Sequence, residues 1–538
     1  SRKTGFKCDD VINAIDAEKL INYNDLKTCF KSIPFNATNA AQIIDSVSQI
    51  LSKYYVFLDQ ANEKPPNGFT YQPTNLISEL KSLRNKKNFK FDNEFKIFND
   101  TVEPSNNDCE VTEIDGKPAL QVIIEFANNS IPHSKDLGVR FNMALAPSTG
   151  LFAQQFTSRI DLPEASSITY KLLCSKKKPF LLKREWSIEF NDAIDFSSFC
   201  LNLNSETNKV EASTSSDKIT KLTSRDKFKL LQLNNNKPKI AHAKLILDLP
   251  KAEFYLLDDE DFGIAVITEE DVRFEDYLQS GFEEFKKRKV KKLILDFSNN
   301  DGGDVTVPLF INSILFSPKQ PNSYPTKINI NDFTVPVIKN NFKTLGPNDS
   351  DLYNPNFYLS FPSGDRFNSS DEFIGSRKDH ASSLTLNALT PDELERIKDA
   401  PHFPWKNDDI IILTNGYCIS ACALITLFFS EIHKVKTIAV GGLLDTKLTF
   451  STFPGGLITS SDVILGDAGD TTTANIDDPN SLLLPVRKSF SFFENGTEKD
   501  VLEYSYRPAD YKLDYNESNA RDPSFLWVDA AKILSKKS

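Results

Sequence analysis

No uninterrupted apolar run in this chain of 538 residues reaches the ~18 to 20 residues that are needed to span a bilayer. The chain also has no excess of positive charge. It contains 63 Lys and Arg residues and 74 Asp and Glu residues, which gives a net charge of −11. A protein that binds nucleic acid by neutralising phosphates carries the opposite balance. We therefore predict neither a membrane span nor a nucleic-acid partner.

Histidine is scarce, and its spacing offers no metal site. No two histidines stand at i and i+4, and none lies near a cysteine pair with zinc-finger spacing. The Gly302-Gly303 pair lacks the Lys-Ser/Thr of a phosphate loop and the third glycine of a dinucleotide fingerprint. We predict no metal and no cofactor. The five histidines are His133, His242, His380, His402 and His433.

Cysteines and glycosylation signals favour an oxidising compartment. The seven cysteines are odd in number, so at least one is free or pairs between chains. Asn-x-Ser/Thr sequons are spread along the chain, and the first residue is Ser1, as expected if a signal peptide has been removed or the sequence has been trimmed. We predict a secreted, extracellular glycoprotein. The candidate glycan acceptors are Asn36, Asn99, Asn128, Asn348, Asn368, Asn495 and Asn516.

Three regions are predicted along the chain. Residues 1–100 have helical spacing, in segments 9–33, 38–58 and 74–86. Residues 101–249 contain short runs of Val, Ile, Leu and Phe, which indicate a mostly β region, with a polar loop at 205–224. The runs that we interpret as strands lie at 120–126, 185–190 and 245–249.

Residues 250–538 alternate strands and helices, which is typical of an α/β fold with a largely parallel sheet. Strands are predicted at 262–268, 293–297, 410–413 and 436–440, and helices at 274–285 and 421–433. A segment at 317–409, rich in Pro, Asn and Ser, is interpreted as an insertion. Such a sheet places its ligand site at the carboxyl ends of its strands.

Two loops stand at those strand ends. Ser420 comes directly before the apolar helix that starts at Ala421, where unpaired N–H groups and the helix dipole favour an oxyanion. The alternative is that Ser420 only caps the helix. The Gly302-Gly303 loop lets backbone N–H groups approach a ligand closely, or it forms an ordinary strand-to-helix turn. Cys418 and Cys422, around Ser420, are either bridged or two buried thiols, and the same holds for Cys8 and Cys29.

Taken together and in this order, the two loops resemble a known family. Residues 293–303, Leu-Ile-Leu-Asp-Phe-Ser-Asn-Asn-Asp-Gly-Gly, are similar to the "DLR-N-GG" segment of the tail-specific serine peptidases of clan SK. Residues 415–423, Asn-Gly-Tyr-Cys-Ile-Ser-Ala-Cys-Ala, followed by 435–442, are similar to that family's nucleophile segment. The Cys-x-Ser-x-Cys pattern and residues 29–36 resemble its secreted fungal branch most closely.

The resemblance implies a ClpP/crotonase-like catalytic core over 250–538, preceded by a β-rich, PDZ-like region over 101–249. It implies Ser420 as the nucleophile, and Gly302 or Gly303 together with Ala421 as oxyanion donors. Residues 501–508 are similar to the segment that supplies the glutamate of the Ser-His-Glu members, such as the chlamydial protease-like activity factor. Glu503 would then orient the general base, or it is a solvated strand glutamate.

The chain departs from the pattern of the Ser-His-Glu members at the expected general base, because no "HDGH"-like segment follows residues 95–98. Either the segment was lost from the gene model, or the protein is inactive, or another residue is the base. Lys447 stands at a spacing similar to that of the lysine in the Ser-Lys members, although the glycines that flank that lysine are missing. His133 is interpreted as a loop residue and His433 as a helix carboxyl cap.

The function predicted from these observations is a serine endopeptidase that hydrolyses polypeptide through an acyl-enzyme at Ser420. The alternative is a pseudopeptidase that binds extended polypeptide without cutting it. A carbohydrate- or cofactor-binding α/β protein has only the generic sheet topology to support it.

Overall fold

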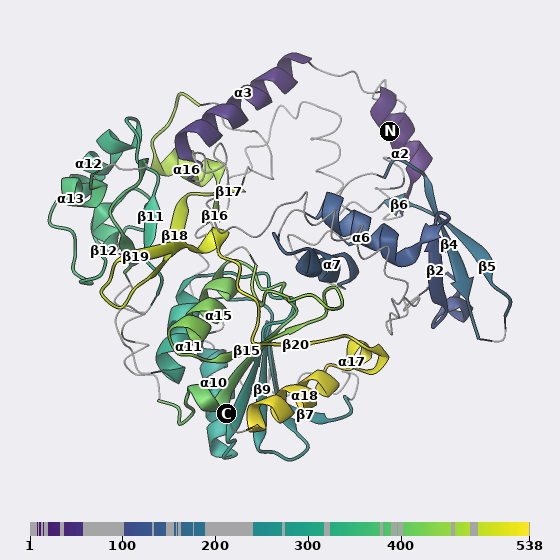
Figure 1. Ribbon diagram of the computed structural model, residues 1–538. Helices are drawn as coiled ribbons and strands as arrows, with labels where there is room; N and C mark the ends of the chain where they lie inside the picture. Colours follow the sequence, from purple (N-terminus) through teal and green to yellow (C-terminus); the bar gives the residue numbers. More distant parts are fainter. Residues whose placement is uncertain are drawn as a thin grey trace.

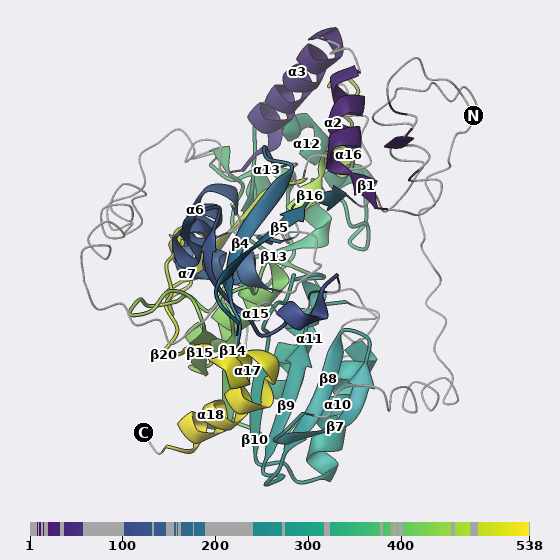
Figure 2. The same cartoon turned by 90° about the vertical axis from the view of Figure 1, so that its right-hand side faces the viewer.

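The computed structural model describes residues 20–32, 37–56, 100–131, 134–146, 163–188, 240–316, 323–388, 402–452, 458–473 and 483–536, apart from short stretches inside these ranges, and a few isolated residues elsewhere. These residues form a mixed α/β structure with several sheets, arranged in three lobes (Figure 1 and Figure 2). In the described part of the chain, no helix is both long and apolar enough to cross a membrane.

A seven-stranded sheet with the order β20-β15-β14-β10-β9-β8-β7 forms the first lobe. From β9 to β20 the strands are parallel, whereas β7 and β8 are antiparallel. Strands β10 and β14 are almost wholly apolar because both faces of a parallel sheet are covered. The strands are β7 (Ala243–Leu249), β8 (Ala252–Leu257), β9 (Phe262–Ile267), β10 (Lys292–Asp296), β14 (Ile410–Thr414), β15 (Lys436–Val440) and β20 (Tyr511–Leu513).

Helices cover both faces of this sheet. α10 (Glu275–Lys287), α11 (Thr306–Leu315) and α15 (Ala421–Glu431) pack on one face, and α18 (Ser524–Ser535) packs on the other. On the second face, the indole Nε1 of Trp527 donates to the buried carboxylate of Asp296 at 2.7 Å. The predicted β-α-β units and their segment boundaries are confirmed to within about two residues, as expected for strongly periodic segments.

A five-stranded sheet with the order β12-β13-β11-β18-β19 forms the second lobe, on the left in Figure 1. Three of its strands, β11, β12 and β13, come from the predicted insertion, and β11 pairs with β18 from the carboxyl-terminal part of the chain. The insertion therefore contributes to a second hydrophobic core, together with α3 and the chain after residue 458. The elements are β11 (Thr326–Ile328), α12 (Thr334–Thr344), β12 (Tyr358–Ser360), α13 (Ser370–Ile374), β13 (Thr385–Asn387), β18 (Arg487–Phe492) and β19 (Glu498–Val501), with α16 (Ser461–Asp467) and the hairpin of β16 (Ile458–Ser460) and β17 (Leu483–Pro485) beside them.

A four-stranded sheet with the order β3-β2-β4-β5 and two helices form the third lobe. A disulfide between Cys109 and Cys174 joins the chain before β2 to the chain after β4. Cys200, the seventh cysteine, lies outside the described residues. The elements are β2 (Glu110–Ile114), β3 (Lys117–Pro118), α6 (Ala119–Ser130), α7 (Leu137–Leu145), β4 (Ser167–Leu173) and β5 (Phe180–Glu185).

The strand predicted at 120–126 is wrong, because these residues belong to helix α6. Its buried side chains, Ala119, Ile123, Phe126 and Ala127, recur at the spacing of a helix face, whereas a strand buries every second residue. Of the other two runs, 245–249 lies in β7, and 185–190 begins at the end of β5 and includes β6 (Ser187–Ile188). The loop predicted at 205–224 lies outside the described residues.

The amino-terminal helices are found in part. α2 (Tyr23–Ser32) lies in the segment predicted at 9–33, and α3 (Ala37–Tyr54) in that at 38–58, whereas 74–86 lies outside the described residues. The disulfide Cys8–Cys29 holds α2, and the short strand β1 (Ile21–Asn22) pairs with β6. α2 thus packs on the third lobe while α3 packs on the second (Figure 1).

The last turn of α3 is attached to the second lobe by a buried carboxylate. Asp470 accepts hydrogen bonds from Lys53 Nζ at 2.8 Å and from Tyr54 Oη at 2.9 Å. Burial alone would raise the pKa of Asp470, but the hydrogen bonds from Lys53 and the neighbouring hydroxyl groups hold it well below its usual range.

We expect Asp470→Ala to lower the free energy of unfolding by about 3 kcal/mol, because it leaves Lys53 and Tyr54 without their acceptor. Urea unfolding of the variant measures this. Glu494→Ala, at an exposed position, is the control and should change the free energy by less than about 0.5 kcal/mol. Equal small changes in both variants would show that Asp470 does not hold α3.

Candidate active site

The two loops predicted to form a site meet at the carboxyl ends of neighbouring parallel strands β10 and β14. The backbone N–H of Asn300 donates to the carbonyl oxygen of Tyr417, and the N–H of Ile419 donates to that of Asn300, both at 3.0 Å. The phenol of Tyr417 also donates to the carboxylate of Asp301. The glycine loop therefore lies directly against the residues that precede Ser420.

Ser420 occupies a strained turn between β14 and α15. Its φ of 53° and ψ of −116° are unusual for a residue other than glycine, and its side chain makes no capping hydrogen bond. An observed outlier of this kind is a reason to look for function. A strained strand-to-helix turn is also where an α/β-hydrolase exposes its nucleophilic serine. The structure therefore disfavours the alternative that Ser420 is only a helix cap.

The glycine loop is in contact with the turn that carries Ser420. A Cβ added to Gly302 would lie 2.9 Å from the Cβ of Ser420 and 3.2 Å from the nitrogen of Ala421, so the loops are in contact. The N–H of Gly302 already donates to Asn300 Oδ1 at 2.7 Å. Neither Gly303 nor Ala421 donates its N–H to another described residue. The N–H groups of Gly303 and Ala421 are therefore better candidates than that of Gly302 to donate to a bound oxyanion.

A disulfide between Cys418 and Cys422 brackets Ser420, so the bridged alternative is the one found. Both cysteines are buried, and the bridge joins the loop to the first turn of α15. It limits the freedom of the turn that carries Ser420.

We expect the double variant Cys418→Ala/Cys422→Ala to lose about 2 kcal/mol of unfolding free energy, because a bridge over four residues closes only a short loop. The comparison is Cys109→Ala/Cys174→Ala, whose bridge spans 65 residues and should contribute about 4 kcal/mol. Denaturant unfolding of both variants measures the difference. A larger loss from the first variant would contradict the loop-length argument.

A buried carboxyl group that the sequence did not single out supports the glycine loop. Glu270 is only 1% exposed, and its Oε1 accepts from Asn300 Nδ2 at 2.9 Å, whereas no described residue donates to its Oε2. Its backbone binds the loop twice, through its N–H to Gly302 O at 3.0 Å and through its carbonyl to Asp304 N at 2.7 Å. Burial raises the pKa of Glu270 to about 8. No local pattern marks it, because its partners lie about 30 residues away.

Helix α7 of the third lobe contacts the carboxyl ends of strands β14 and β15. Asn142 Nδ2 donates to the carbonyl oxygens of Asn415 at 2.7 Å and Val440 at 2.8 Å. Before α7, the hydroxyl of Ser134 pairs with that of Thr452 at 2.9 Å, and the N–H of Thr452 donates to Cys418 O at 2.8 Å. The segment that starts at Ser134 is thus linked to the nucleophile loop through Thr452.

Glu503 lies in the short 3₁₀ turn Leu502–Tyr504, and a lysine binds its carboxylate. Lys135 donates to Oε1 and also to the backbone carbonyl of Glu503, whereas Oε2 is buried and has no partner among the described residues. Burial raises the pKa of Glu503, although Lys135 opposes the shift. The environment is buried, unlike that of a solvated strand glutamate.

No described residue forms a hydrogen bond with the side chain of Ser420. Lys447 is exposed in the loop after β15, and no hydrogen bond between described residues pairs it with Ser420. His133 lies outside the described residues. The ring of His433 stacks on Phe316 and pairs with Asn312 at 2.7 Å, one residue beyond the helix cap at Ile432.

The described residues contain no cluster of three or more His, Cys, Asp or Glu side chains that is able to hold a metal ion. Among the candidate glycan acceptors, Asn348, Asn368, Asn495 and Asn516 are exposed. Asn128 is half-buried in α6, and Asn36 and Asn99 lie outside the described residues.

Comparison with known proteins finds similar solved structures. No family model matches the chain, and no curated protein sequence does so significantly. Mature CPAF in complex with lactacystin has a TM-score of 0.49 at 13% identity, over 93% of this chain and 98% of that chain. Mature CPAF alone has a TM-score of 0.49 at 12% identity, over 92% of this chain and 97% of that chain. The photosystem II D1 C-terminal processing protease has a TM-score of 0.27 at 9% identity, over 89% of this chain and 94% of that chain.

Proposed function

We propose that this protein is a serine peptidase that cleaves polypeptide through an acyl-enzyme at Ser420. The observation that carries the proposal is the strained turn of Ser420, which contacts the glycine loop at Gly302. In that loop and at the start of α15, the N–H groups of Gly303 and Ala421 donate to no other described residue. The loop motifs support membership of the tail-specific peptidases, with a ClpP/crotonase-like core. The domain limits 1–100, 101–249 and 250–538, the PDZ-like middle region and the fungal branch stay predictions.

In the proposed reaction, the Ser420 hydroxyl loses its proton to a base and its oxygen bonds to the scissile carbonyl carbon. The carbonyl oxygen becomes an oxyanion that accepts from the N–H groups of Gly303 and Ala421. The C–N bond then breaks and the proton passes to the departing amine. Water attacks the ester and returns the proton to Ser420. The positive end of the α15 dipole favours the oxyanion as well.

Glu503 is proposed to orient the base, because its buried Oε2 has no partner among the described residues. His133 is the base candidate to test first, since the two residues that follow it bind Thr452 and Glu503. Lys447 stays a weaker candidate because of its exposure.

A second candidate function, a pseudopeptidase that binds polypeptide, is favoured by one observation. In the described residues, Ser420 has no hydrogen-bonded base and Lys135 already neutralises Glu503. A serine without a base reacts slowly at neutral pH.

Labelling with a fluorophosphonate probe between pH 5 and pH 10 tests the proposal. We expect the wild type to label and Ser420→Ala to give no signal, whereas Ser52→Ala, which changes an exposed serine of α3, should label like the wild type. His133→Ala and Lys447→Ala should each be measured in the same way. Replacing the residue that acts as the base should remove the rise of the labelling rate with pH. No labelling of folded wild-type protein would overturn the proposal and favour the pseudopeptidase.

Secretion is proposed on the three disulfides and the four exposed sequon asparagines. Treatment of protein secreted from a eukaryotic host with an N-glycosidase, followed by peptide mass mapping, tests the glycan sites. Unmodified Asn348, Asn368, Asn495 and Asn516 would contradict the glycoprotein prediction.

A further inference from the structure

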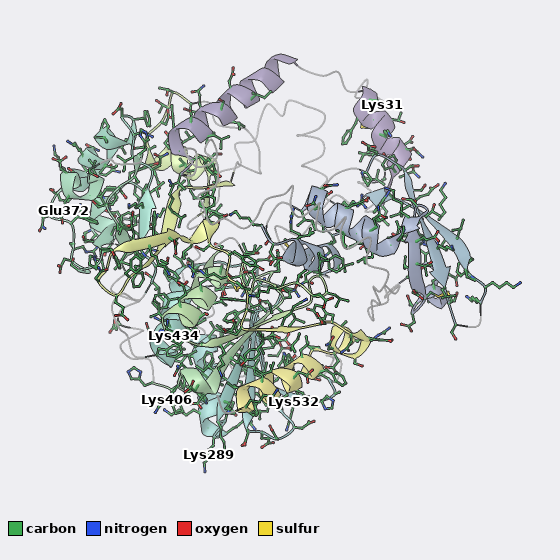
Figure 3. All side chains as sticks on the ribbon, in the orientation of Figure 1. Lys31, Lys289, Glu372, Lys406, Lys434 and Lys532 are labelled. Carbon is green, nitrogen blue, oxygen red and sulfur yellow. A yellow bond between two sulfur atoms is a disulfide. The ribbon has the colours of Figure 1, made fainter. Side chains whose placement is uncertain are left out.

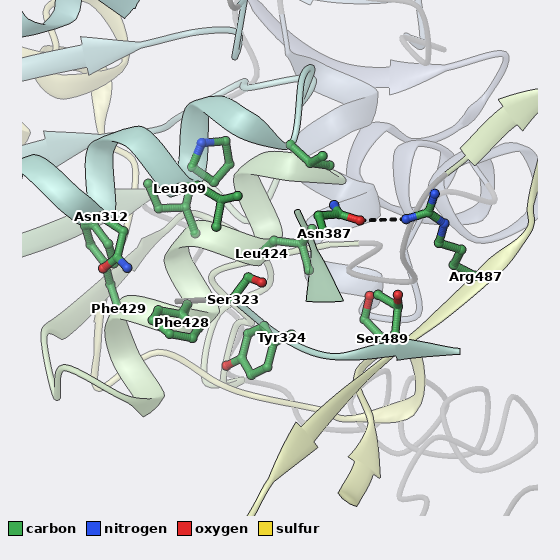
Figure 4. Close-up of a pocket in the computed structure, with 14 residues that line it drawn as sticks. Leu309, Asn312, Ser323, Tyr324, Asn387, Leu424, Phe428, Phe429, Arg487 and Ser489 are labelled. Carbon is green, nitrogen blue, oxygen red and sulfur yellow. Dashed lines mark hydrogen bonds between the residues drawn. The ribbon is translucent and has the colours of Figure 1, made fainter. Parts of the chain in front are cut away.

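A pocket lies between helices α11 and α15 of the first lobe and the five-stranded sheet of the second lobe (Figure 4). Its empty volume, including the open mouth, is about 620 Å³. Two of its lining residues place it beside the candidate active site. Leu424 is one helical turn after Ser420, and Val305 is two residues after Gly303.

The two ends of the pocket differ in chemistry. Figure 4 shows Leu309, Phe428 and Phe429 of the helices toward one end, and Arg487 and Ser489 of β18 at the other. A side chain that enters the pocket would therefore meet apolar walls along its stem and a cation with hydroxyl groups at its tip.

Arg487 is a buried cation that contacts no carboxylate of the described residues. It is 5% exposed, Nη1 donates to Asn387 Oδ1 at 2.7 Å, and the guanidinium also contacts the hydroxyl and ring of Tyr358. Among the described residues, no carboxylate comes within 4 Å of it. Asp467, a carboxylate whose pKa Arg487 lowers electrostatically, accepts instead from the N–H of Leu352 at 2.9 Å.

Two polar atoms at this end of the pocket have no hydrogen-bond partner within the described part of the chain. Arg487 Nε and Ser489 Oγ are both buried and unpaired in the described part of the structure. An unpaired buried donor and an unbalanced buried charge each destabilise a protein, so such a pair in a pocket indicates a missing ligand group. The group that satisfies a guanidinium and a hydroxyl together is a carboxylate.

We infer that this pocket binds an acidic side chain of the polypeptide substrate, with its carboxylate toward Arg487 and Ser489 and its methylene groups against Leu424 and Phe428. The inference rests on the proposed function for the placement of the scissile bond, and it makes the protein selective for glutamate beside that bond. A glutamine of the same shape lacks the charge, and a leucine lacks both polar contacts.

The test measures binding to Ser420→Ala, so that cleavage plays no part. Fluorescent, acetylated and amidated ten-residue peptides are compared, identical except for Glu, Gln or Leu at one position that is moved along the peptide. We expect the Glu peptide to bind at least about ten times more tightly than the Gln peptide at one position, by fluorescence anisotropy. In Ser420→Ala/Arg487→Gln this preference should vanish.

Two further variants keep the test decisive if Arg487→Gln fails to fold. Ser489→Ala removes a pocket hydroxyl and should reduce the Glu preference several-fold, and Leu424→Trp fills the pocket and should weaken binding of the Glu peptide at least tenfold. Lys488→Gln, the intervening residue of β18, is the matched charge control and should keep the Glu preference.

The outcomes separate the two proposals. Equal affinity for Glu and Gln peptides, or a Glu preference that survives in the Arg487→Gln and Leu424→Trp variants, overturns the pocket inference, and so does the absence of peptide binding by a protein that labels at Ser420. If the Glu peptide binds preferentially but the wild-type protein never labels at Ser420, the pocket inference is supported and the proposed peptidase function is overturned.

Discussion

Replacing Gly303 by alanine is expected to reduce the labelling rate of Ser420 at least about 100-fold. A Cβ at this position would lie 2.0 Å from the carbonyl oxygen of Glu270 and 2.7 Å from its carbonyl carbon. Both are backbone atoms, so no side chain can rotate out of the way. The φ of 148° adds strain for any L-residue with a side chain. The loop must move, and the N–H of Gly303 moves with it.

The measurement is the second-order rate constant of fluorophosphonate labelling, together with thermal unfolding to show that the variant is folded. Gly364→Ala is the matched control, because it also has a positive φ, of 76°, but an added Cβ meets nothing within 4 Å. It should cost about 1 kcal/mol of stability and leave labelling unchanged. A folded Gly303→Ala variant that labels at the wild-type rate would remove Gly303 from the oxyanion site.

The parts of this site that the sequence predicts are those that local patterns determine. β10 and β14 are short apolar runs, each followed by a turn and a helix, and parallel strands necessarily bring their carboxyl ends together. The contact between the Gly302-Gly303 loop and the Ser420 turn follows from that topology. The choice of Gly303 over Gly302 does not, because it depends on the hydrogen bond from Gly302 to the Asn300 side chain.

Other parts depend on pairings between distant segments. The three strands of the predicted insertion are extended to a five-stranded sheet by β18 and β19, which lie more than 90 residues after its last strand. The pocket lined by Arg487 therefore has no local signature. The strand predicted at 120–126 failed because a short apolar run is compatible with a helix as well as a strand. The lysine that binds Glu503 comes from another lobe altogether.

The carboxyl group of Glu270 should make the stability of the protein depend strongly on pH. Burial is the largest cause that raises its pKa to about 8, and the carboxylates of Glu269 and Asp301 raise it further, whereas the amide of Asn300 lowers it. Lys251, the nearby cation, is paired with Glu269. Glu270 is therefore protonated at neutral pH, which keeps a negative charge away from the loop that would bind an oxyanion.

The sign of the effect follows from the two pKa values. In the unfolded chain Glu270 titrates near the ordinary glutamate pKa of 4.5, so between pH 4.5 and about 8 the folded protein holds one more proton than the unfolded chain. Its contribution to stability is complete below the lower value and is lost as the pH rises through the higher one. For a fully buried group, the loss is on the order of 3 to 5 kcal/mol.

We expect Glu270→Gln to abolish this dependence, because glutamine accepts from Asn300 as the protonated acid does and never ionises. The variant should match the wild type near pH 5 and exceed its free energy of unfolding by about 3 kcal/mol or more at pH 9, as measured by urea unfolding across that range. Glu269→Gln, which alters the half-exposed neighbour, removes only a smaller cause of the raised pKa and should keep most of the wild-type pH dependence. Parallel curves for the wild type and Glu270→Gln would mean that Glu270 is ionised in the folded protein, with a negative charge then lying next to Gly303 where the proposed chemistry needs none.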